Sequence, residues 1–225
     1  MLLVEAALGF IIGYLYASQL ESLFHDWVND APGSRVTKWK SFHWILAPMI
    51  RTHFSHHTIH HCRTYRENYV TQFRSLQERV TLNQELLQFQ HGREIIAAMY
   101  GNRFSFWGWV AFCAPLVPGP ILAFGFWGAP AALGMLLAVS LPPIMSNFVH
   151  EYLHMPTERA LAEAPWPISW FARTPYFRFI ARHHFLHHRY LRFNFNLVVG
   201  ADLWRGKFRR PSNRDCAEME RLGLK

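Results

Sequence analysis

Histidine is the residue type whose number and spacing most clearly indicate chemistry in this sequence. The 225 residues include 14 histidines, and 12 of these lie in four short segments. One is in SLFHDWVND, five are in THFSHHTIHH, two are in NFVHEYLHM and four are in ARHHFLHHRY. Neutral imidazole is a ligand for iron, zinc, copper and nickel. The four segments therefore predict a metal site, although their spacing does not choose the metal.

The spacing within the segments selects candidate ligands. Residues three and four apart share one face of an α-helix. The motifs HHTIHH (56–61) and HHFLHH (183–188) are parallel, since basic and aromatic residues and then an Asn–aromatic pair follow each of them. We expect two helices with equivalent roles on opposite sides of a metal pair, and the parallel favours His57 over His53 and His56. The candidate ligands are His57, His60 and His61, then His150 and His154, then His184, His187 and His188.

Two apolar segments must position these histidines. Residues 1–20 are apolar apart from Glu5 and lack the features of a signal peptide, so we expect a membrane span or a membrane-dipping helix. Residues 106–148 are almost free of charge and long enough for two spans joined by a turn near residues 125–130. A hairpin returns both of its flanks to the same membrane face. The histidine segments on either side of it can therefore meet there.

The remaining segments are polar or interfacial. Residues 75–99 predict an amphipathic helix, residues 165–176 an interfacial segment and residues 207–225 an exposed tail. We treat residues 1–225 as one domain. The expected fold is mainly α: an integral membrane helical protein whose cytosolic helical cap holds a histidine-rich dinuclear metal site.

Composition agrees with a mixed membrane and polar body. Aromatic residues form 16% of the chain and charged residues only 17%, where about 25% is usual. A mean hydropathy of −0.02 argues against a transporter made almost wholly of spans. The net charge of +8 is dispersed among apolar segments, which favours a face against anionic lipid over binding of nucleic acid. Three cysteines without a pattern indicate a reducing compartment.

The order HxxHH, HxxxH and HxxHH around apolar hairpins resembles the fatty acid hydroxylase/sterol desaturase superfamily of integral membrane di-iron enzymes. The stretch NFNLVVGADLWRGKFR (194–209) is similar to the typical ending of that family, in which an Asn–aromatic pair precedes a Trp-containing segment. The resemblance covers about residues 25–210. The histidine motifs are specific in combination, whereas any one of them alone is a weak signal.

The first motif departs from the family pattern of two histidines three or four residues apart. His25 has Asn29 at i+4 and Asp30 at i+5. Asp30 is the better candidate, because a carboxylate is a competent iron ligand and an amide is a poor one. If Asp30 is not a ligand, either the site is asymmetric or His53 or His56 takes the place.

The resemblance implies a function. Two iron ions (Fe²⁺) and O₂ would hydroxylate or desaturate an unactivated C–H bond of a lipid or lipid-like substrate, with the metal site on the cytoplasmic face. It assigns no catalytic residue beyond the metal ligands. We find no flavin, haem or iron–sulfur motif, so electrons would come from a separate protein of the cytochrome b5 or ferredoxin type.

Other interpretations remain. The string HEYLH (150–154) matches the HExxH motif of zinc proteases, but a membrane metalloprotease leaves both HxxHH motifs without a role. A metal-binding or metal-transport protein usually places its ligands within the spans, whereas these histidines lie outside the apolar runs. His53, His56 and His183 could orient ligands, and we expect His43 and His91 to be structural or surface groups.

Overall fold

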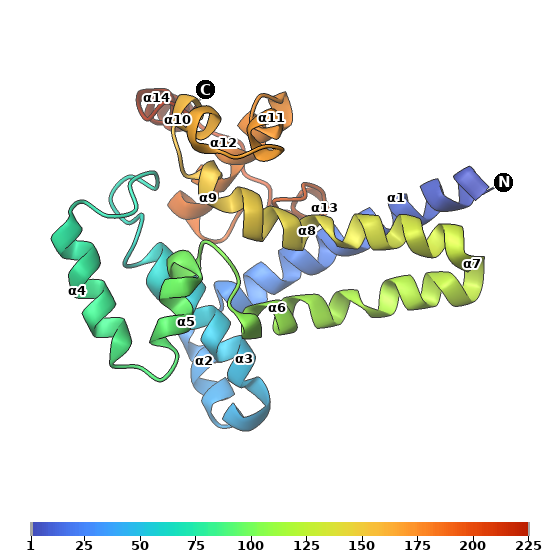
Figure 1. Ribbon diagram of the computed structural model, residues 1–225, viewed down its shortest axis with the longest axis horizontal. Coiled ribbons are helices and arrows are strands. Elements are labelled where there is room, and N and C mark those ends of the chain that lie inside the picture. Colours follow the sequence, from blue (N-terminus) through green and yellow to red (C-terminus); the bar gives the residue numbers. More distant parts are fainter. Residues whose placement is uncertain (1, 225) are drawn as a thin grey trace.

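The computed structural model describes residues 2–224, and every regular element in that range is helical, as predicted (Figure 1). α1 (Leu2–Phe24) continues directly into the π-helical turn η1 (His25–Asn29). The second apolar stretch comprises α6 (Phe106–Cys113), η4 (Ala114–Leu116), α7 (Pro118–Val139), α8 (Leu141–Ile144), η5 (Met145–Val149) and α9 (His150–Leu153).

The second stretch is a hairpin. Gly128 has φ 81° and ψ −176°, so the chain reverses inside α7 and within the predicted turn at residues 125–130. Each leg has more than 20 residues and is therefore about 30 Å long or more. Leu2–Asn29 and Phe106–Leu153 are the two helical stretches in residues 2–224 that are long and apolar enough to cross a membrane. Both legs run beside α1 and project away from the rest of the molecule (Figure 1).

Glycine allows α1 and α7 to approach closely. A Cβ atom on Gly134 would lie 1.9 Å from the carbonyl oxygen of Ala6, and one on Gly9 would lie 2.1 Å from that of Ala131. Neither position therefore has room for a methyl group. Small residues have this function where apolar helices pack backbone to backbone.

A Gly134→Ala substitution is expected to lower the free energy of unfolding by about 1–3 kcal/mol, because the added methyl group must push α1 away from α7. Gly125→Ala is the matched control: it lies in the same helix, and a Cβ atom there meets no other atom within 4 Å. The control should be neutral or slightly stabilising, because alanine favours a helix more than glycine does. Thermal unfolding in detergent measures both variants. Equal melting temperatures would contradict this close packing.

The outward faces of α1 and the hairpin are apolar and exposed. Leu3 is 86% exposed, Phe126 75% and Ile121 64%. Soluble monomers rarely expose apolar patches of this extent, and such patches are typical of surfaces that contact lipid or another protein.

The remaining helices form a cap at the other end of the apolar legs (Figure 1). They are α2 (Gly33–Lys40), α3 (His43–His53), η2 (Phe54–His61), α4 (Leu76–Leu87), α5 (Gly92–Ala97), η3 (Met99–Gly101), α10 (Thr157–Glu163), α11 (Ile168–Phe171), α12 (Pro175–Tyr190), α13 (Ala201–Trp204) and α14 (Asn213–Arg221). α12 lies at the centre of the cap, because its residues Phe177 and Ile180 are fully buried in the hydrophobic core.

Two expectations for the cap need correction. The single helix expected at residues 75–99 is divided into α4 and α5, with a break at residues 88–91. The tail expected to be exposed is partly folded: α14 starts at a capping box of Ser212 and Asp215, and Met219 is fully buried beside α12. Met219 and Leu224, which is also buried, pack against Phe185 and Leu186 of α12, and this apolar contact holds the segment on the cap.

A buried carboxylate connects α1 to the chain after α12. Glu21 accepts hydrogen bonds from the backbone N–H groups of Leu197 (2.9 Å) and Val198 (3.0 Å) and from Nδ2 of Asn196 (3.0 Å). These contacts satisfy the hydrogen-bonding capacity of the buried Glu21 side chain. They also place the C-terminal end of α1, where His25 follows, against the segment after α12.

Candidate metal centre

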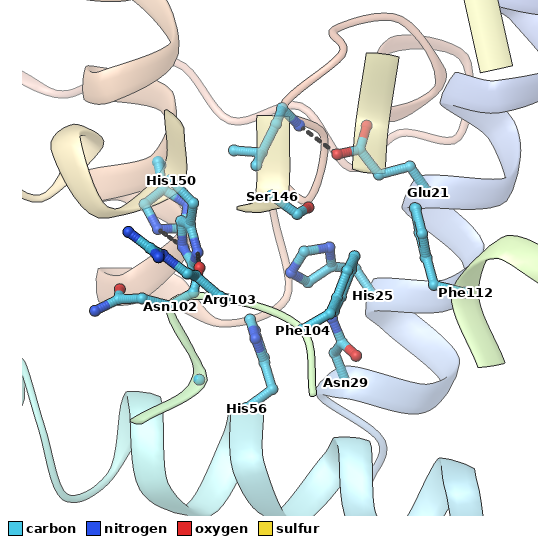
Figure 2. Close-up of a pocket in the computed structure, with 13 residues that line it drawn as sticks. Glu21, His25, Asn29, His56, Asn102, Arg103, Phe104, Phe112, Ser146 and His150 are labelled. Atoms are coloured by element: carbon cyan, nitrogen blue, oxygen red, sulfur yellow. Dashed lines mark hydrogen bonds between the residues drawn. The ribbon is translucent and has the colours of Figure 1, made fainter. Parts of the chain in front are cut away.

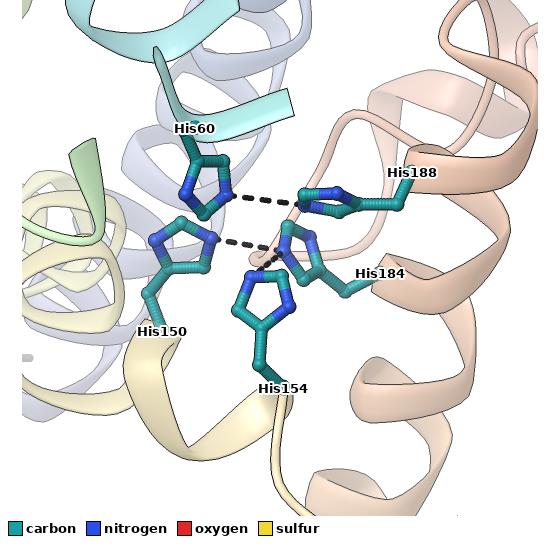
Figure 3. Close-up of side chains that lie close together, drawn as sticks. All are labelled: His60, His150, His154, His184 and His188. Atoms are coloured by element: carbon teal, nitrogen blue, oxygen red, sulfur yellow. Dashed lines mark hydrogen bonds between the residues drawn. The ribbon is translucent and has the colours of Figure 1, made fainter. Parts of the chain in front are cut away.

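Five buried histidines from three segments converge beyond the apolar legs (Figure 3). One ring nitrogen of each lies within 4.8 Å of those of the others, so together they could hold a metal ion. η2 supplies one side chain, α9 and the residue after it supply two, and α12 supplies two. We call this the five-histidine group: His60, His150, His154, His184 and His188.

The hydrogen bonds of two members show where their lone pairs point. His150 Nδ1 lies 2.9 Å from the carbonyl oxygen of Asn102, and His154 Nδ1 lies 2.9 Å from that of Tyr69. A carbonyl can only accept, so each Nδ1 carries the proton and each Nε2 of the neutral ring has a free lone pair. Both Nε2 atoms face His184 Nε2, at 2.9 and 3.0 Å. A single Nε2 proton on His184 can satisfy only one of them, and a cation bound between the rings would satisfy all three.

A second group of donors adjoins the first. One donor atom each of His25, Asp30, His56 and His187 lies within 4.8 Å of the others, and we call this set the aspartate group. His187 Nδ1 lies 3.0 Å from the carbonyl oxygen of Phe193, which leaves a lone pair on its Nε2. That Nε2 lies 3.3 Å from Asp30 Oδ2.

Three donor atoms of the aspartate group are buried and lack a hydrogen-bond partner: His25 Nε2, Asp30 Oδ2 and His187 Nε2. Buried polar atoms without partners are costly and rare in native proteins. Their convergence on one point fits a bound cation, which would satisfy all three together.

His61 connects the two groups. Its Nε2 lies 3.0 Å from His56 Nε2 and 3.6 Å from Asp30 Oδ1, while its Nδ1 lies 3.1 Å from His188 Nδ1. The donors therefore form one continuous cluster with two centres, which is an arrangement that could hold two ions side by side.

Eight of the ten side chains expected as ligands fall in these groups, and His61 lies between them. His57 is the exception. Its side chain is 30% exposed and its Nδ1 contacts Asp30 Oδ1 at 3.0 Å, while His56 lies in the aspartate group instead. Of the residues in HHTIHH, the structure brings His56 and His60 into the donor groups and His61 between them, and it places His57 beside Asp30.

The physical reason is the helix type of η2. Residues 54–61 form a π-helix, in which the backbone N–H of Cys62 bonds to the carbonyl oxygen of His57, five residues earlier. Five-residue bonding places His56 below His61 and turns His57 outward, whereas α-helical spacing would have placed His57 on the shared face. π-Helical turns are rare and are often found at functional sites.

The same π-helical geometry explains why the carboxylate of Asp30 lies beside His25. In η1 the N–H of Asp30 bonds to the carbonyl oxygen of His25, at 2.8 Å. The i+5 residue is therefore brought to the face of His25. α12 is a regular α-helix, so His184, His187 and His188 share a face there and His183 points away, with its Nε2 3.4 Å from Asp202 Oδ2.

Asn102 connects several parts of the five-histidine group, although its sequence context gave no signal. Its side chain is 1% exposed and its Nδ2 donates to Tyr65 Oη at 3.0 Å. The Tyr65 ring stacks on His154, with centroids 3.8 Å apart. The preceding Gly101 has φ 90°, and a Cβ atom there would lie 2.6 Å from the carbonyl oxygen of Ser55. This tight turn presents the Asn102 carbonyl to His150, a contact that sequence spacing could not reveal.

A narrow cavity reaches both groups (Figure 2). His25 and His56 of the aspartate group line it, as do His150 and His184 of the five-histidine group. Its apolar lining residues are Phe104 between η3 and α6, Phe112 in α6 and Leu197 in the segment after α12. The cavity volume is only about 20 Å³, and polar side chains line it as well: Glu21, Asn29, Asn102, Arg103 and Ser146.

The surroundings favour neutral imidazoles beside an ionised carboxylate. Burial and the neighbouring imidazoles hold the pKa of His60, His184 and His188 well below the usual 6.5. Burial opposes ionisation of Asp30, but nearby imidazoles, His61 first among them, hold its pKa well below 3.8. At neutral pH the groups thus present lone pairs and one negative charge, which is the form that binds cations.

Metal-free protein is expected to lose stability as the pH falls below about 6.5. The unfolded chain protonates these histidines there while the folded chain keeps them neutral, so the unfolded state binds more protons and the free energy of unfolding decreases. Each such histidine contributes up to about 1.4 kcal/mol per pH unit. Asp30 adds a loss of the same sign at lower pH. Thermal unfolding after chelation, as a function of pH, measures the slope, and a pH-independent melting temperature would contradict the buried neutral cluster.

No family model, curated protein or solved structure matches this chain.

Proposed function

We propose that this protein is a membrane-embedded di-iron oxygenase that hydroxylates or desaturates an unactivated C–H bond of a lipid or lipid-like substrate. The observation that carries the proposal is the pair of adjoining, buried donor groups that share a cavity beside lipid-sized apolar helices. The order of the histidine motifs, with its resemblance to the fatty acid hydroxylase/sterol desaturase superfamily, supports iron over the other metals that imidazole binds.

The residues present fit two such ions. The five-histidine group offers five nitrogen donors, while the aspartate group offers three nitrogens and a carboxylate oxygen, with His61 between them. Iron bound in these groups would supply the reduction of O₂ and the removal of hydrogen from the substrate. The protein holds the donors in place through carbonyl contacts to Nδ1 atoms and through Asp30, whose Oδ1 faces His57. Such contacts fix the ring orientation of metal-binding histidines.

Three apolar side chains, Phe104, Phe112 and Leu197, line the cavity among mostly polar ones. Phe104 and Phe112 line the same space as the imidazoles (Figure 2). The cavity volume is about 20 Å³, which is room for about one water molecule, so the proposal requires the lining side chains to move apart for a methylene group of a lipid chain to reach the metal centre. The register of the chain would select which carbon reacts.

Membrane insertion through α1 and the two hairpin legs, with the cap on the cytoplasmic side, is part of the proposal. Three helical legs of about 30 Å match the hydrocarbon thickness of a bilayer. The net charge of +8 suits a cap that faces anionic lipid and an acidic electron-transfer partner of the cytochrome b5 or ferredoxin type.

One contact weighs against the metalloprotease interpretation of HEYLH. A protease of that type uses its glutamate as a general base beside the metal. Here Glu151 accepts a hydrogen bond from Arg103 Nη2 at 2.8 Å and belongs to neither donor group. The interpretation also leaves the aspartate group without a role.

Isotope incorporation tests the proposal. Membranes that contain the full chain, an electron donor and ¹⁸O₂ are expected to yield lipids with one added ¹⁸O atom, or lipids lacking two hydrogens, when extracts are examined by mass spectrometry. The products should be absent without O₂ and in membranes that lack the chain. If the protein is loaded with iron and the electron donor is active, unchanged lipid pools would contradict the proposed activity.

A further inference from the structure

A pocket on the outer side of α12 is lined by three arginines and no acidic residue. Arg178 and Arg182 come from α12 and Arg209 from the segment before α14. The pocket has a volume of about 460 Å³ and is open to solvent. It lies on the side of α12 opposite the metal groups, because His183 lines it while His184 and His187 point the other way.

The three guanidinium groups have no carboxylate partner among the described residues 2–224. Arg182 contacts only sulfur atoms, with Nε 3.4 Å from Met219 Sδ and an Nη 3.6 Å from Cys216 Sγ. The Arg209 guanidinium lies 3.7 Å from the centroid of the Tyr190 ring, and its Nε is buried without a hydrogen-bond partner. Two of the three guanidinium groups are thus held in position by contacts that leave them without a carboxylate partner.

Neighbouring carboxylates do not neutralise the pocket. Asp215 is bound by Arg189 and by the hydroxyl of Tyr190, and Glu218 is bound by Arg221. Asp202 lies behind His183, fully buried. Planar guanidinium groups that are preorganised and unpaired match the oxygens of a phosphate.

The apolar walls distinguish a lipid headgroup from a free anion. Phe179, Phe208 and Leu186 line the same pocket, and Phe179 is 42% exposed at its rim. α11, which precedes α12, exposes Trp170 to 67%, and aromatic side chains of this kind gather at membrane interfaces. An inorganic phosphate would leave these surfaces in water, whereas a phospholipid would cover them with its glycerol and acyl groups.

We propose that this arginine pocket, formed by Arg178, Arg182 and Arg209, binds the phosphate group of an anionic membrane phospholipid. The site is separate from the metal centre. It rests on the membrane association in the proposed function but not on the metal or the reaction, so binding can be tested whether or not the chain turns over substrate.

Three probes, each added to the full chain in detergent, separate the contribution of the phosphate to binding from that of the acyl chains. Dioctanoyl phosphatidylglycerol carries the phosphate and the acyl chains, dioctanoylglycerol carries the chains alone, and inorganic phosphate carries the anion alone. Native mass spectrometry and the ligand-dependent shift of the melting temperature report binding. We expect saturable binding of the phospholipid at least about tenfold tighter than that of either other probe, since charge-assisted hydrogen bonds and apolar contacts add. Equal binding of inorganic phosphate, or of dioctanoylglycerol, would overturn the lipid assignment.

Substitutions of single arginines test whether the phospholipid binds in this pocket. Arg178→Gln and Arg209→Gln are each expected to weaken phosphatidylglycerol binding about tenfold. Arg178 is exposed, so its loss leaves the fold intact. Arg173→Gln is the control: it removes an equal charge from an exposed position close in sequence but outside the pocket, and should change the affinity less than about twofold. An equal loss in the control would indicate general charge attraction and overturn the site, as would unchanged binding in both pocket variants.

Discussion

A His184→Ala variant is expected to purify with about one metal ion per chain instead of two and to show no measurable oxygen-dependent turnover. His184 Nε2 faces both His150 Nε2 and His154 Nε2, so it is the central donor of the five-histidine group. Its removal leaves a gap that water fills poorly in a buried site. Changes to residues that merely support a ligand cost about 10- to 100-fold in metal affinity, so loss of a central ligand should exceed that range.

Elemental analysis of the detergent-purified protein measures the metal content, and product formation under ¹⁸O₂ measures turnover. His43→Ala is the matched control, because His43 is an exposed histidine outside both groups. It should retain two metals and full activity. Two metals in His184→Ala, or fewer than two in the parent protein after iron loading, would contradict a dinuclear centre at these residues. If zinc is found first, iron reloading decides, because zinc binds such sites more tightly than ferrous iron.

Alanine substitutions at the adjacent residues His56 and His57 are expected to have different effects on metal content. His56→Ala is expected to lose the ion of the aspartate group, because His56 lies among its donors. His57→Ala should keep two ions per chain and bind the second about 10-fold more weakly, since His57 contacts the ligand Asp30 and not the centre itself. The two variants remove the same side chain from neighbouring positions of one helical turn, so each controls for the other.

Metal titration after chelation, followed by elemental analysis, distinguishes the two variants. The opposite order, with His57→Ala losing the ion and His56→Ala keeping it, would indicate that residues 54–61 are α-helical in the metal-bound protein. Similar losses in both would indicate that the whole turn collapses when either ring is removed. Only the predicted order agrees with the π-helical register.

The sequence by itself determined the residue types and the broad architecture. Apolar runs long enough to span a bilayer predicted the first helix and the hairpin, and Gly128 lies in the turn expected near residues 125–130. The four histidine segments predicted a metal site, and the structure brings them together into donor groups that could hold metal. These features are local or compositional, so periodicity and spacing are enough to recognise them.

Helix type and distant contacts were decided only by the tertiary structure. Spacing rules assume i+4 hydrogen bonding, and the switch to i+5 bonding in η1 and η2 is what brings Asp30 beside His25 and exchanges His57 for His56. The carbonyls that orient His150 and His154 belong to Asn102 and Tyr69, which are 48 and 85 residues away in the chain. A backbone carbonyl has no sequence signature. The packing of the cap around α12 decides which carbonyls reach the centre, and thereby which lone pairs face it.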